Sequence, residues 1–355
     1  MNICRSGRKV CSVFRVDRRY SLFILVSGDL PGAMWVYCVC ELLKIMEKAI
    51  VKVEHLSHRY SAQWAIRDIN FEINQKGVVG LLGSNGAGKS TTMNIICGVL
   101  NQTEGEVYIN GISLSEHPVE AKQNIGFLPQ KPPLYADLNV DEYLTYCANL
   151  RLMDKKQVKP AVEEAKRRCG ITHFSHRLIR NLSGGYQQRV GIAQAIVHNP
   201  AFVVLDEPTN GLDPNQIVEI RELIKEIAKD RSVLLSTHIL SEVQATCDYI
   251  RMIENGQVVF AGTIDEFDNY IEPDTFVAKF ENRPTEVELS RVEGIVQVIP
   301  LSETRYRFRF EGGSEVMQRM IECSVNNGWG LSEIALEKIS LDEIFAQLSG
   351  KRVNE

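Results

Sequence analysis

The chain alternates between short strand-like patterns and longer helical ones. From Met46 to about Leu114, polar and apolar residues alternate in runs such as "AIVKVEHLSHRY" and "GEVYINGISL", which is typical of antiparallel strands with one solvated face. Three other runs, "GVVGLLG", "AFVVLDE" and "SVLLST", are almost wholly apolar, as expected of strands buried on both faces. A helix is predicted between the last two, with Asp213 as its cap and Pro214 in its first turn. This order of strands and helices predicts a parallel sheet.

The rest of the chain has two further patterns. The chain is predicted to be helical from 137 to about 180, and "YIRMIENGQVVFAGT" predicts a hairpin on an Asn255-Gly256 turn. After about residue 269 the pattern restarts as strand–helix–strand–strand–helix–strand, followed by a last helix at "LDEIFAQLSG". That is the split βαβ, or ferredoxin-like, order. We therefore expect a small α+β domain over 275–350, with an irregular α+β tail as the alternative.

A glycine-rich segment follows the first buried strand. "GSNGAGKS" fits the phosphate-binding pattern G-x-x-x-x-G-K-[ST] at every fixed position. Its glycines let backbone N–H groups face phosphate oxygens; Lys89 would reach the β- and γ-phosphates, and the Ser90 hydroxyl would bind Mg²⁺. The alternative, a turn that binds nothing, is disfavoured because a helical pattern follows directly. The candidate nucleotide-binding residues here are Gly83, Ser84, Asn85, Gly86, Ala87, Gly88, Lys89, Ser90, Thr91 and Thr92.

Two carboxylates and a histidine follow the other buried strands. "FVVLDEP" places Asp206 and Glu207 at a strand end. Beside a phosphate loop, the aspartate is expected to hold Mg²⁺, and the glutamate to orient or deprotonate the attacking water. His238, after the next strand, is well placed to touch a γ-phosphate. Taken alone, the acidic pair would be a helix cap beside a solvated side chain, and the histidine a structural residue.

In chain order, five segments resemble the ATP-binding subunit of ABC transporters, over roughly Ala49 to Gly262. They are the phosphate loop, "GFLPQ", "LSGGYQQR", "VVLDEPTNGLD" and "STH". The resemblance implies that Tyr60 stacks on adenine and that Gln130 senses Mg²⁺ and the membrane partner. It further implies that Glu207 is the general base and that His238 holds the γ-phosphate. ATP and Mg²⁺ are the implied cofactors, with Ser90, Gln130 and Asp206 as the metal ligands.

The segment "LSGGYQQR" poses a separate question, because the chain already has a phosphate loop. In the family that it resembles, Ser183, Gly184 and Gly185 close over the γ-phosphate of a second subunit. A helix N-terminus there favours a negative charge. Tyr186 stands where glutamine is commonest in that family, a position that varies. The resemblance therefore implies a head-to-tail dimer with two ATP molecules between the subunits, whether homodimer or heterodimer.

The resemblance also implies a fold and a setting. The fold is a P-loop NTPase over 46–268, with a RecA-like parallel sheet core, an antiparallel β subdomain and a helical subdomain at about 137–180, plus the small α+β domain. The single cassette resembles exporter ATPases of the multidrug and gliding-motility type. We expect transmembrane permease subunits as partners, docked near the helical subdomain, and a peripheral location on the cytoplasmic face of the inner membrane.

Two other functions are weighed against transport. An ABC ATPase acting on ribosomes or DNA would typically carry two cassettes or long coiled-coil insertions, which this chain lacks. The net charge of −5 also argues against a general nucleic-acid binder, so no nucleic-acid partner is expected. An ATPase that drives a mechanical or regulatory envelope complex without cargo is not separated from transport by the sequence. The nine scattered cysteines indicate reduced thiols rather than a disulfide frame.

Residues 1–45 differ from the rest in composition. Their net charge is +4, and a basic start precedes the apolar run "SLFILVSGDLPGAMWVYCVCELL". A membrane anchor is one interpretation, but Asp29 would lie in mid-span at a cost of about 2.5–3.5 kcal/mol. We favour an extension upstream of the true start at Met46, outside the fold.

A chain that begins at Met46 is therefore expected to keep full ATPase activity and to join its membrane partner. Steady-state ATPase assays and membrane fractionation of both forms measure this. Loss of membrane recruitment in the shorter form would support the anchor interpretation instead.

Overall fold

The computed structural model describes residues 49–270, 273–313 and 315–337, helical residues 344, 345 and 348, and three strands near the N-terminus. These strands, β1 (Ile3–Ser6), β2 (Lys9–Asp17) and β3 (Tyr20–Leu25), form an antiparallel sheet of their own. They belong to a unit, Met1–Lys48, separate from Ala49–Glu355. Beyond β3, the apolar run considered as an anchor lies outside the described residues. Within the described part of the chain, no helix combines the length and the apolar character needed to cross a membrane.

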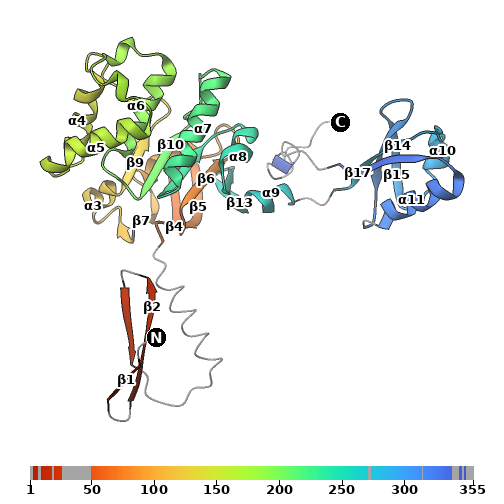
Figure 1. The fold of residues 1–355 in the computed structure, drawn as a ribbon, viewed down its shortest axis with the longest axis horizontal. Helices are drawn as coiled ribbons and strands as arrows, with labels where there is room; N and C mark the ends of the chain where they lie inside the picture. Colours follow the sequence, from red (N-terminus) through yellow and green to blue (C-terminus); the bar gives the residue numbers. More distant parts are fainter. Residues whose placement is uncertain are drawn as a thin grey trace. The chain divides into compact units, whose positions relative to one another are not determined.

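A six-stranded sheet forms the centre of the larger unit (Figure 1). Its strands are β6 (Gly77–Leu82), β9 (Ile125–Leu128), β10 (Phe202–Asp206), β11 (Ser232–Ser236), β12 (Tyr249–Glu254) and β13 (Gln257–Thr263). They lie in the order β13-β12-β6-β11-β10-β9, and every neighbouring pair is parallel except β12–β13. The parallel sheet is thus confirmed. So is the hairpin, whose turn residues Asn255 and Gly256 both have positive φ, as a type I′ turn requires.

An antiparallel sheet and a set of helices complete this part of the chain. The sheet has the order β5-β4-β7-β8, with β4 (Val51–Tyr60), β5 (Gln63–Ile73), β7 (Glu104–Ile109) and β8 (Ile112–Ser113). The helices are α2 (Lys89–Ile96), α3 (Pro118–Gln123), α4 (Val140–Leu150), α5 (Lys155–Arg168), α6 (Gly184–Ile196), α7 (Pro214–Ala228), α8 (Leu240–Thr246) and α9 (Ile264–Asp268), with 3₁₀ turns at Thr172–Phe174 and Ile179–Asn181. The predicted cap of α7 is confirmed, because the Asp213 carboxylate accepts from the Gln216 N–H at 3.0 Å.

Side chains of the parallel strands alternate between two apolar cores. In β10, Phe202 and Val204 belong to the core shared with the antiparallel sheet and α2, whereas Val203 and Leu205 belong to the core beneath α6, α7 and α8. All four are fully buried. This two-residue period explains the unbroken apolar runs in the sequence, because neither face of the sheet meets water. The antiparallel strands have one wet face and so alternate, as predicted.

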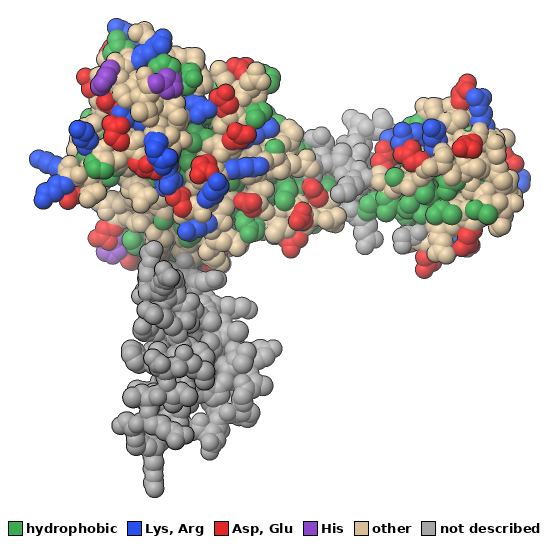
Figure 2. Space-filling view, in the orientation of Figure 1, with side chains coloured by type: hydrophobic (Ala, Val, Ile, Leu, Met, Phe, Trp, Pro, Cys, Tyr) green, Lys and Arg blue, Asp and Glu red, His purple; other side chains and the backbone are tan. Residues whose placement is uncertain are grey.

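The two sheets and helices α2 to α9 lie within residues 49–268, which we call the cassette. Helices α4, α5 and α6 group at one end of it, away from the antiparallel sheet (Figure 1). A capping box at Asn139 and Glu142 starts α4. The ammonium of Lys166 in α5 is almost fully buried and donates to Asp141, Glu163 and Ser175. Basic and acidic side chains are interspersed over the visible face of this region (Figure 2).

The C-terminal region forms a small α+β domain, as expected. Its elements are β14 (Thr275–Phe280), α10 (Glu286–Leu289), β15 (Ile295–Pro300), β16 (Arg305–Phe310), α11 (Glu315–Asn327) and β17 (Leu331–Leu336). The antiparallel strands lie in the order β15-β16-β14-β17. The domain has its own core, in which Phe276 stacks on Phe308. Its extent over 275–350 and its ferredoxin-like classification stay predictions.

The predicted last helix lies mostly outside the described residues, but three of its positions are described. Ile344 is fully buried within the core beneath α6, α7 and α8, and Phe345 and Leu348 pack against the same core. This core belongs to the cassette, not to the C-terminal domain. The chain therefore contributes to the cassette both before and after the small domain.

We predict that Ile344→Ala destabilises the cassette by about 2–5 kcal/mol, because it leaves a cavity in a packed core. Hydrogen exchange of cassette amides and urea unfolding measure the loss. Val325→Ala in α11 is the matched control, since Val325 is 76% exposed and its truncation should change stability by less than about 0.5 kcal/mol. Equal protection of the cassette in both variants would contradict this prediction.

Candidate active site

The candidate site residues follow strands that lie side by side. Register pairs Leu81 of β6 with Ser236 of β11, and Ser236 with Asp206 of β10, so these strands end at the same height. β9, next to β10, leads to Gln130. In a parallel sheet, ligands bind beyond the carboxyl ends of the strands. The phosphate loop and the loops that carry Gln130, Glu207 and His238 therefore lie at the same edge of the sheet.

The phosphate loop lies between β6 and α2 and needs its glycines. The backbone of Gly88 has φ 111°, and a Cβ there would lie 2.5 Å from Cγ2 of Ile66. A Cβ on Gly83 would lie 2.1 Å from the carbonyl oxygen of Ile253. The loop is thus pressed against neighbouring strands, while Asn85 and Gly86 are exposed. This leaves the outer part of the loop open to a ligand.

Lys89 lies beneath this loop, at the start of α2. Its side chain is 6% exposed, and its ammonium donates to the carbonyl oxygens of Gly83 at 2.8 Å and Ser84 at 3.0 Å. Burial lowers the pKa of Lys89, whereas the charges of Glu207, Asp206 and Glu254 act to raise it. A buried cation among three carboxylates is well placed to meet an anionic ligand.

The other hydroxyl residues at the start of α2 lie differently from one another. Ser90 is exposed and Thr91 is half-buried. Thr92 is fully buried, and its hydroxyl donates to the Gly88 carbonyl at 2.9 Å. The side chain of Thr92 is therefore engaged within the helix, and its nucleotide-binding role stays a prediction.

Glu254 is a site residue that sequence analysis missed. It ends β12, is 7% exposed, and accepts hydrogen bonds from the Ser84 hydroxyl at 2.7 Å and the Ser84 N–H at 3.2 Å. The turn after it adds a bond from the Gly256 N–H to the Ala87 carbonyl at 3.0 Å. The hairpin thus fixes the phosphate loop from one side. The sequence does contain a sign of this role, because the apolar strand "YIRMIE" ends in a carboxylate. A charge buried at that position must find a partner.

Glu207 is the centre of a hydrogen-bond network. Its carboxylate accepts from Nε2 of Gln130 at 2.7 Å and Nδ2 of Asn210 at 3.3 Å, and its Oε1 lies 2.9 Å from Nδ1 of His238. Its backbone has φ 46°, a conformation that costs a non-glycine residue about 1–3 kcal/mol. Such strain persists where the surroundings over-determine it, and it is typical of active sites. Gln130 and His238, 108 residues apart in sequence, thus meet on one carboxylate.

The predicted metal ligands offer a hydroxyl, an amide and a carboxylate. Oxygen donors of this kind suit Mg²⁺. Burial raises the pKa of Asp206, so its carboxylate pays a desolvation cost that a divalent cation would offset. The donor set therefore fits the ion. Among the described residues, no cluster of three or more His, Cys, Asp or Glu could hold a metal ion by itself.

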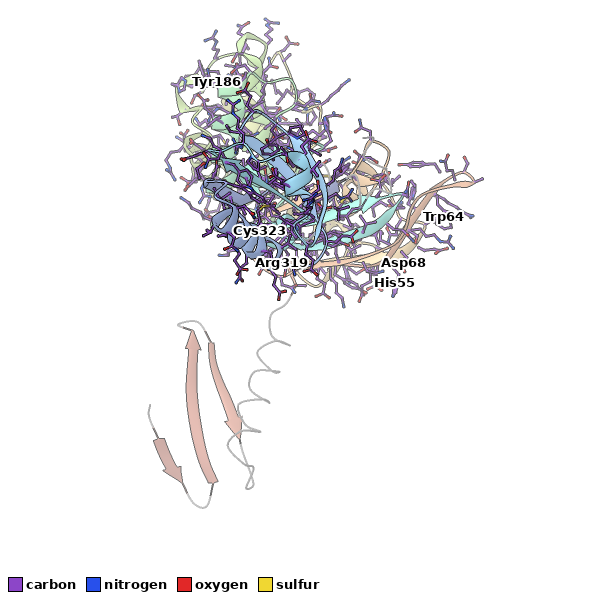
Figure 3. All side chains as sticks on the ribbon, turned by 90° about the vertical axis from the view of Figure 1, so that its right-hand side faces the viewer. His55, Trp64, Asp68, Tyr186, Arg319 and Cys323 are labelled. Atoms are coloured by element: carbon purple, nitrogen blue, oxygen red, sulfur yellow. The ribbon has the colours of Figure 1, made fainter. Side chains whose placement is uncertain are left out.

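Tyr60, the predicted adenine platform, lies at the end of β4 and is 53% exposed. The ring of His58 contacts it edge-on, with 4.7 Å between centroids. On the partner strand β5, Trp64 marks the outer end of the β4–β5 hairpin in Figure 3. The guanidinium groups of Arg59 and Arg67 lie 5.7 and 6.0 Å from the centre of its ring. An exposed aromatic face is available for base stacking.

The segment "LSGGYQQR" (residues 182–189, the signature segment) contains the start of α6. Ser183 occupies the N-cap position of α6 without a capping hydrogen bond from its side chain, and both it and Gly184 are exposed. A Cβ on Gly185 would lie 2.7 Å from the Gln216 side chain. Figure 3 shows Tyr186 well separated from Trp64 at the hairpin. A hollow of about 140 Å³ beside this segment is lined by Ser183, Gly185, Tyr186, Arg189, Gln216, Glu219 and Ile220, none of which belongs to the phosphate loop.

Two histidines lie in the stretch before this segment. The ring of His173 contacts Phe174 and Tyr186, with centroids 4.0 and 5.9 Å apart. His176 is exposed, with its Nδ1 3.8 Å from Asp141. Both are exposed.

The chain is similar to known ATP-binding proteins. The ABC transporter family model matches residues 66–210. The chain is 36% identical to the bacitracin transport ATP-binding protein BcrA of Bacillus licheniformis, covering 59% of this chain and 68% of that protein. It is 31% identical to the lantibiotic transport ATP-binding protein SrtF of Streptococcus pyogenes, covering 66% of this chain and 100% of that protein.

One solved structure of a similar protein has the same fold and was captured after ATP hydrolysis. It is a dimeric ATP-binding cassette in a post-hydrolysis state with ADP and phosphate, 27% identical, with a TM-score of 0.54, covering 60% of this chain and 98% of that one. The fold is thus that of an ABC ATPase, a P-loop NTPase, with an added α+β domain. The chain belongs to the ABC transporter family, as one of its ATP-binding and ATP-hydrolysing subunits.

Proposed function

We propose that this subunit hydrolyses ATP to drive export through separate transmembrane permease subunits. The observation that carries the proposal is the meeting of Gln130, Glu207 and His238 beside the phosphate loop. Support for export comes from the relatives named for bacitracin and lantibiotic transport. The substrate itself would be selected by the membrane subunits.

In the proposed mechanism, each group at the strand ends has one task. Tyr60 stacks on adenine, and the backbone of 83–88 with Lys89 binds the phosphates. Glu207 accepts a proton from the attacking water, since a carboxylate has lone pairs beyond those used by Gln130 and His238. His238 holds the γ-phosphate while bonded to Glu207, which orients both groups.

Mg²⁺ is proposed as the cofactor that accompanies ATP. Ser90, Gln130 and Asp206 would hold it, and when bound it neutralises charge on the transferring phosphate. Because Gln130 donates to Glu207 through Nε2, its amide oxygen would still be available to hold the ion. The glutamine would thereby link the metal to the catalytic carboxylate.

A second cassette is proposed to complete the nucleotide site. Ser183, Gly184 and Gly185 would contact the γ-phosphate held by the partner subunit, with the N-terminus of α6 facing the charge. The exposure of Ser183 and Gly184, and a neighbouring hollow that no phosphate-loop residue lines, support this arrangement. ATP would then hold the dimer closed, and hydrolysis would release it.

The membrane partner is proposed to dock beside Gln130, over the start of the helical region. Tyr135, Tyr146 and Leu150 are 54%, 41% and 63% exposed there, and the two tyrosine rings lie 5.5 Å apart. Exposed apolar groups gathered in this way are typical of an interaction surface. Docking would place the subunit peripherally on the cytoplasmic face of the inner membrane.

Purification of the subunit with its native membrane partner, followed by reconstitution into vesicles, tests the function. Peptide antibiotics, suggested by the relatives' names, are the first substrates to assay. ATP-dependent movement of a substrate across the vesicle membrane is the expected result. ATP hydrolysis that depends on the partner but moves no substrate would instead support the mechanical or regulatory role.

We predict that Glu207→Gln slows hydrolysis by about 10²–10⁴-fold, because glutamine fills the same space but accepts no proton. Lys89 and Asp206 remain, so ATP should still bind and the closed dimer should persist. Size-exclusion chromatography with and without ATP and Mg²⁺, on the subunit and on its complex, detects the dimer. Wild-type hydrolysis in this variant would remove Glu207 from the catalytic role.

We predict that Ser183→Arg spares ATP binding by the isolated subunit but blocks hydrolysis, because Ser183 serves the partner's nucleotide. Lys89→Ala, which removes a contact to the subunit's own nucleotide, should abolish tight binding and is the matched control. Calorimetry for binding and phosphate release for hydrolysis distinguish the two. If the arginine variant lost binding as severely as the alanine variant, the two-subunit site would be wrong.

A further inference from the structure

A buried carboxylate lies behind the catalytic residues without touching them. Glu242, in α8, is 3% exposed. Its Oε2 accepts hydrogen bonds from the hydroxyl of Thr209 at 2.8 Å and the hydroxyl of Thr237 at 3.0 Å. Both threonines are themselves buried, at 7% and 2% exposure. One oxygen atom thus joins two segments that are 28 residues apart in sequence.

The two threonines flank the catalytic pair. Thr209 follows Glu207 by two residues, and Thr237 directly precedes His238. The Thr237 hydroxyl also accepts from the Ile239 N–H at 3.1 Å, so the backbone on the far side of His238 is held as well. Across the site, Oε1 of Glu207 lies 2.9 Å from Nδ1 of His238. The loops that carry Glu207 and His238 are therefore held together twice, by the bridge through Glu242 and by the contact between Glu207 and His238 themselves.

The other carboxylate oxygen of Glu242 faces a basic side chain. Its Oε1 lies 3.7 Å from a guanidinium nitrogen of Arg221 in α7, which partly compensates the buried carboxylate. The arrangement is thus a neutral bridge at one oxygen and an ion pair at the other. Because the hydroxyl bridge and the ion pair use different oxygens of Glu242, a substitution can remove one contact and keep the other.

From this geometry we infer that Glu242 is a positioning residue for ATP hydrolysis, which sets the separation of Glu207 and His238 through its bridge to Thr209 and Thr237. This inference rests on the catalytic roles proposed for Glu207 and His238. The bridge acts on the two loops and not on the phosphate loop. It should therefore affect kcat rather than nucleotide binding.

The first experiment compares Glu242→Ala with Glu242→Gln in the full chain with its partner subunits. The alanine variant breaks the bridge and should lower kcat about 10²-fold, the effect of a small misplacement of catalytic groups, with KM and ATP affinity little changed. The glutamine oxygen can still accept from both hydroxyls, so this variant should keep kcat within about tenfold of wild type. A folded alanine variant with wild-type kcat, or equal losses in both variants, would overturn the inference.

The second experiment applies even if Glu242→Ala does not fold. Thr209→Val and Thr237→Val each open the bridge at one end, so each should lower kcat and the double variant should lose no more than the worse single one. Thr246→Val is the matched control, because Thr246 is buried in the same helix and its hydroxyl has no hydrogen-bond partner among the described residues. Additive losses from the two threonines, or an equal loss from the control, would contradict the bridge.

Failure of the bridge is distinguishable from failure of the proposed site. Glu207→Gln and His238→Ala are measured in parallel with the same assay. If these two keep wild-type kcat, the catalytic assignment is wrong. If they lose activity while the Glu242 and threonine variants do not, only the positioning role is wrong.

Discussion

The in-register pairing of β6, β11 and β10 is the constraint on which the rest of the site depends. Leu81, Ser236 and Asp206 lie level across these strands. The residues that follow each strand therefore leave the sheet at one height, where the proposed nucleotide would lie. A slip of one residue would turn each side chain to the opposite face, directing Asp206 into an apolar core and Leu205 toward the site. The two buried cores oppose this slip, because Phe202 and Val204 pack in one core and Val203 and Leu205 in the other.

Charge then decides what the site accepts. At the site, Lys89 is a buried cation, whereas Asp206, Glu207 and Glu254 are acidic. Burial shifts the pKa values of Lys89 and Asp206 in the directions that oppose ionisation. The side chains alone thus leave an excess of negative charge beside a loop built for phosphate. Backbone N–H groups and the N-terminus of α2 offset part of it. A divalent cation that arrives with the nucleotide would offset the rest, which is why the proposed chemistry needs Mg²⁺ with ATP.

Sequence reasoning found the features that are encoded locally. The phosphate loop, the Asp213 cap and the Asn255-Gly256 turn each depend on a few consecutive residues whose backbone geometry is restricted. The contacts that complete the site are not local. Glu254 meets Ser84 across 170 residues, and Gln130 meets Glu207 across 77, so only the strand order brings them together. The last helix was predicted from its pattern, but no pattern indicated that Ile344 returns to the cassette core.

The bond between Gln130 and Glu207 connects recognition to chemistry. Gln130 begins the segment that leads to Asn139 and the capped start of α4, the region where the membrane partner is proposed to dock. The same glutamine donates to the carboxylate proposed as the general base. Glu207 itself is held by His238 on its other oxygen and has a strained backbone, so it has little freedom to relax independently. A displacement of the docking segment would therefore reach Glu207 through one hydrogen bond, without any change in the sheet.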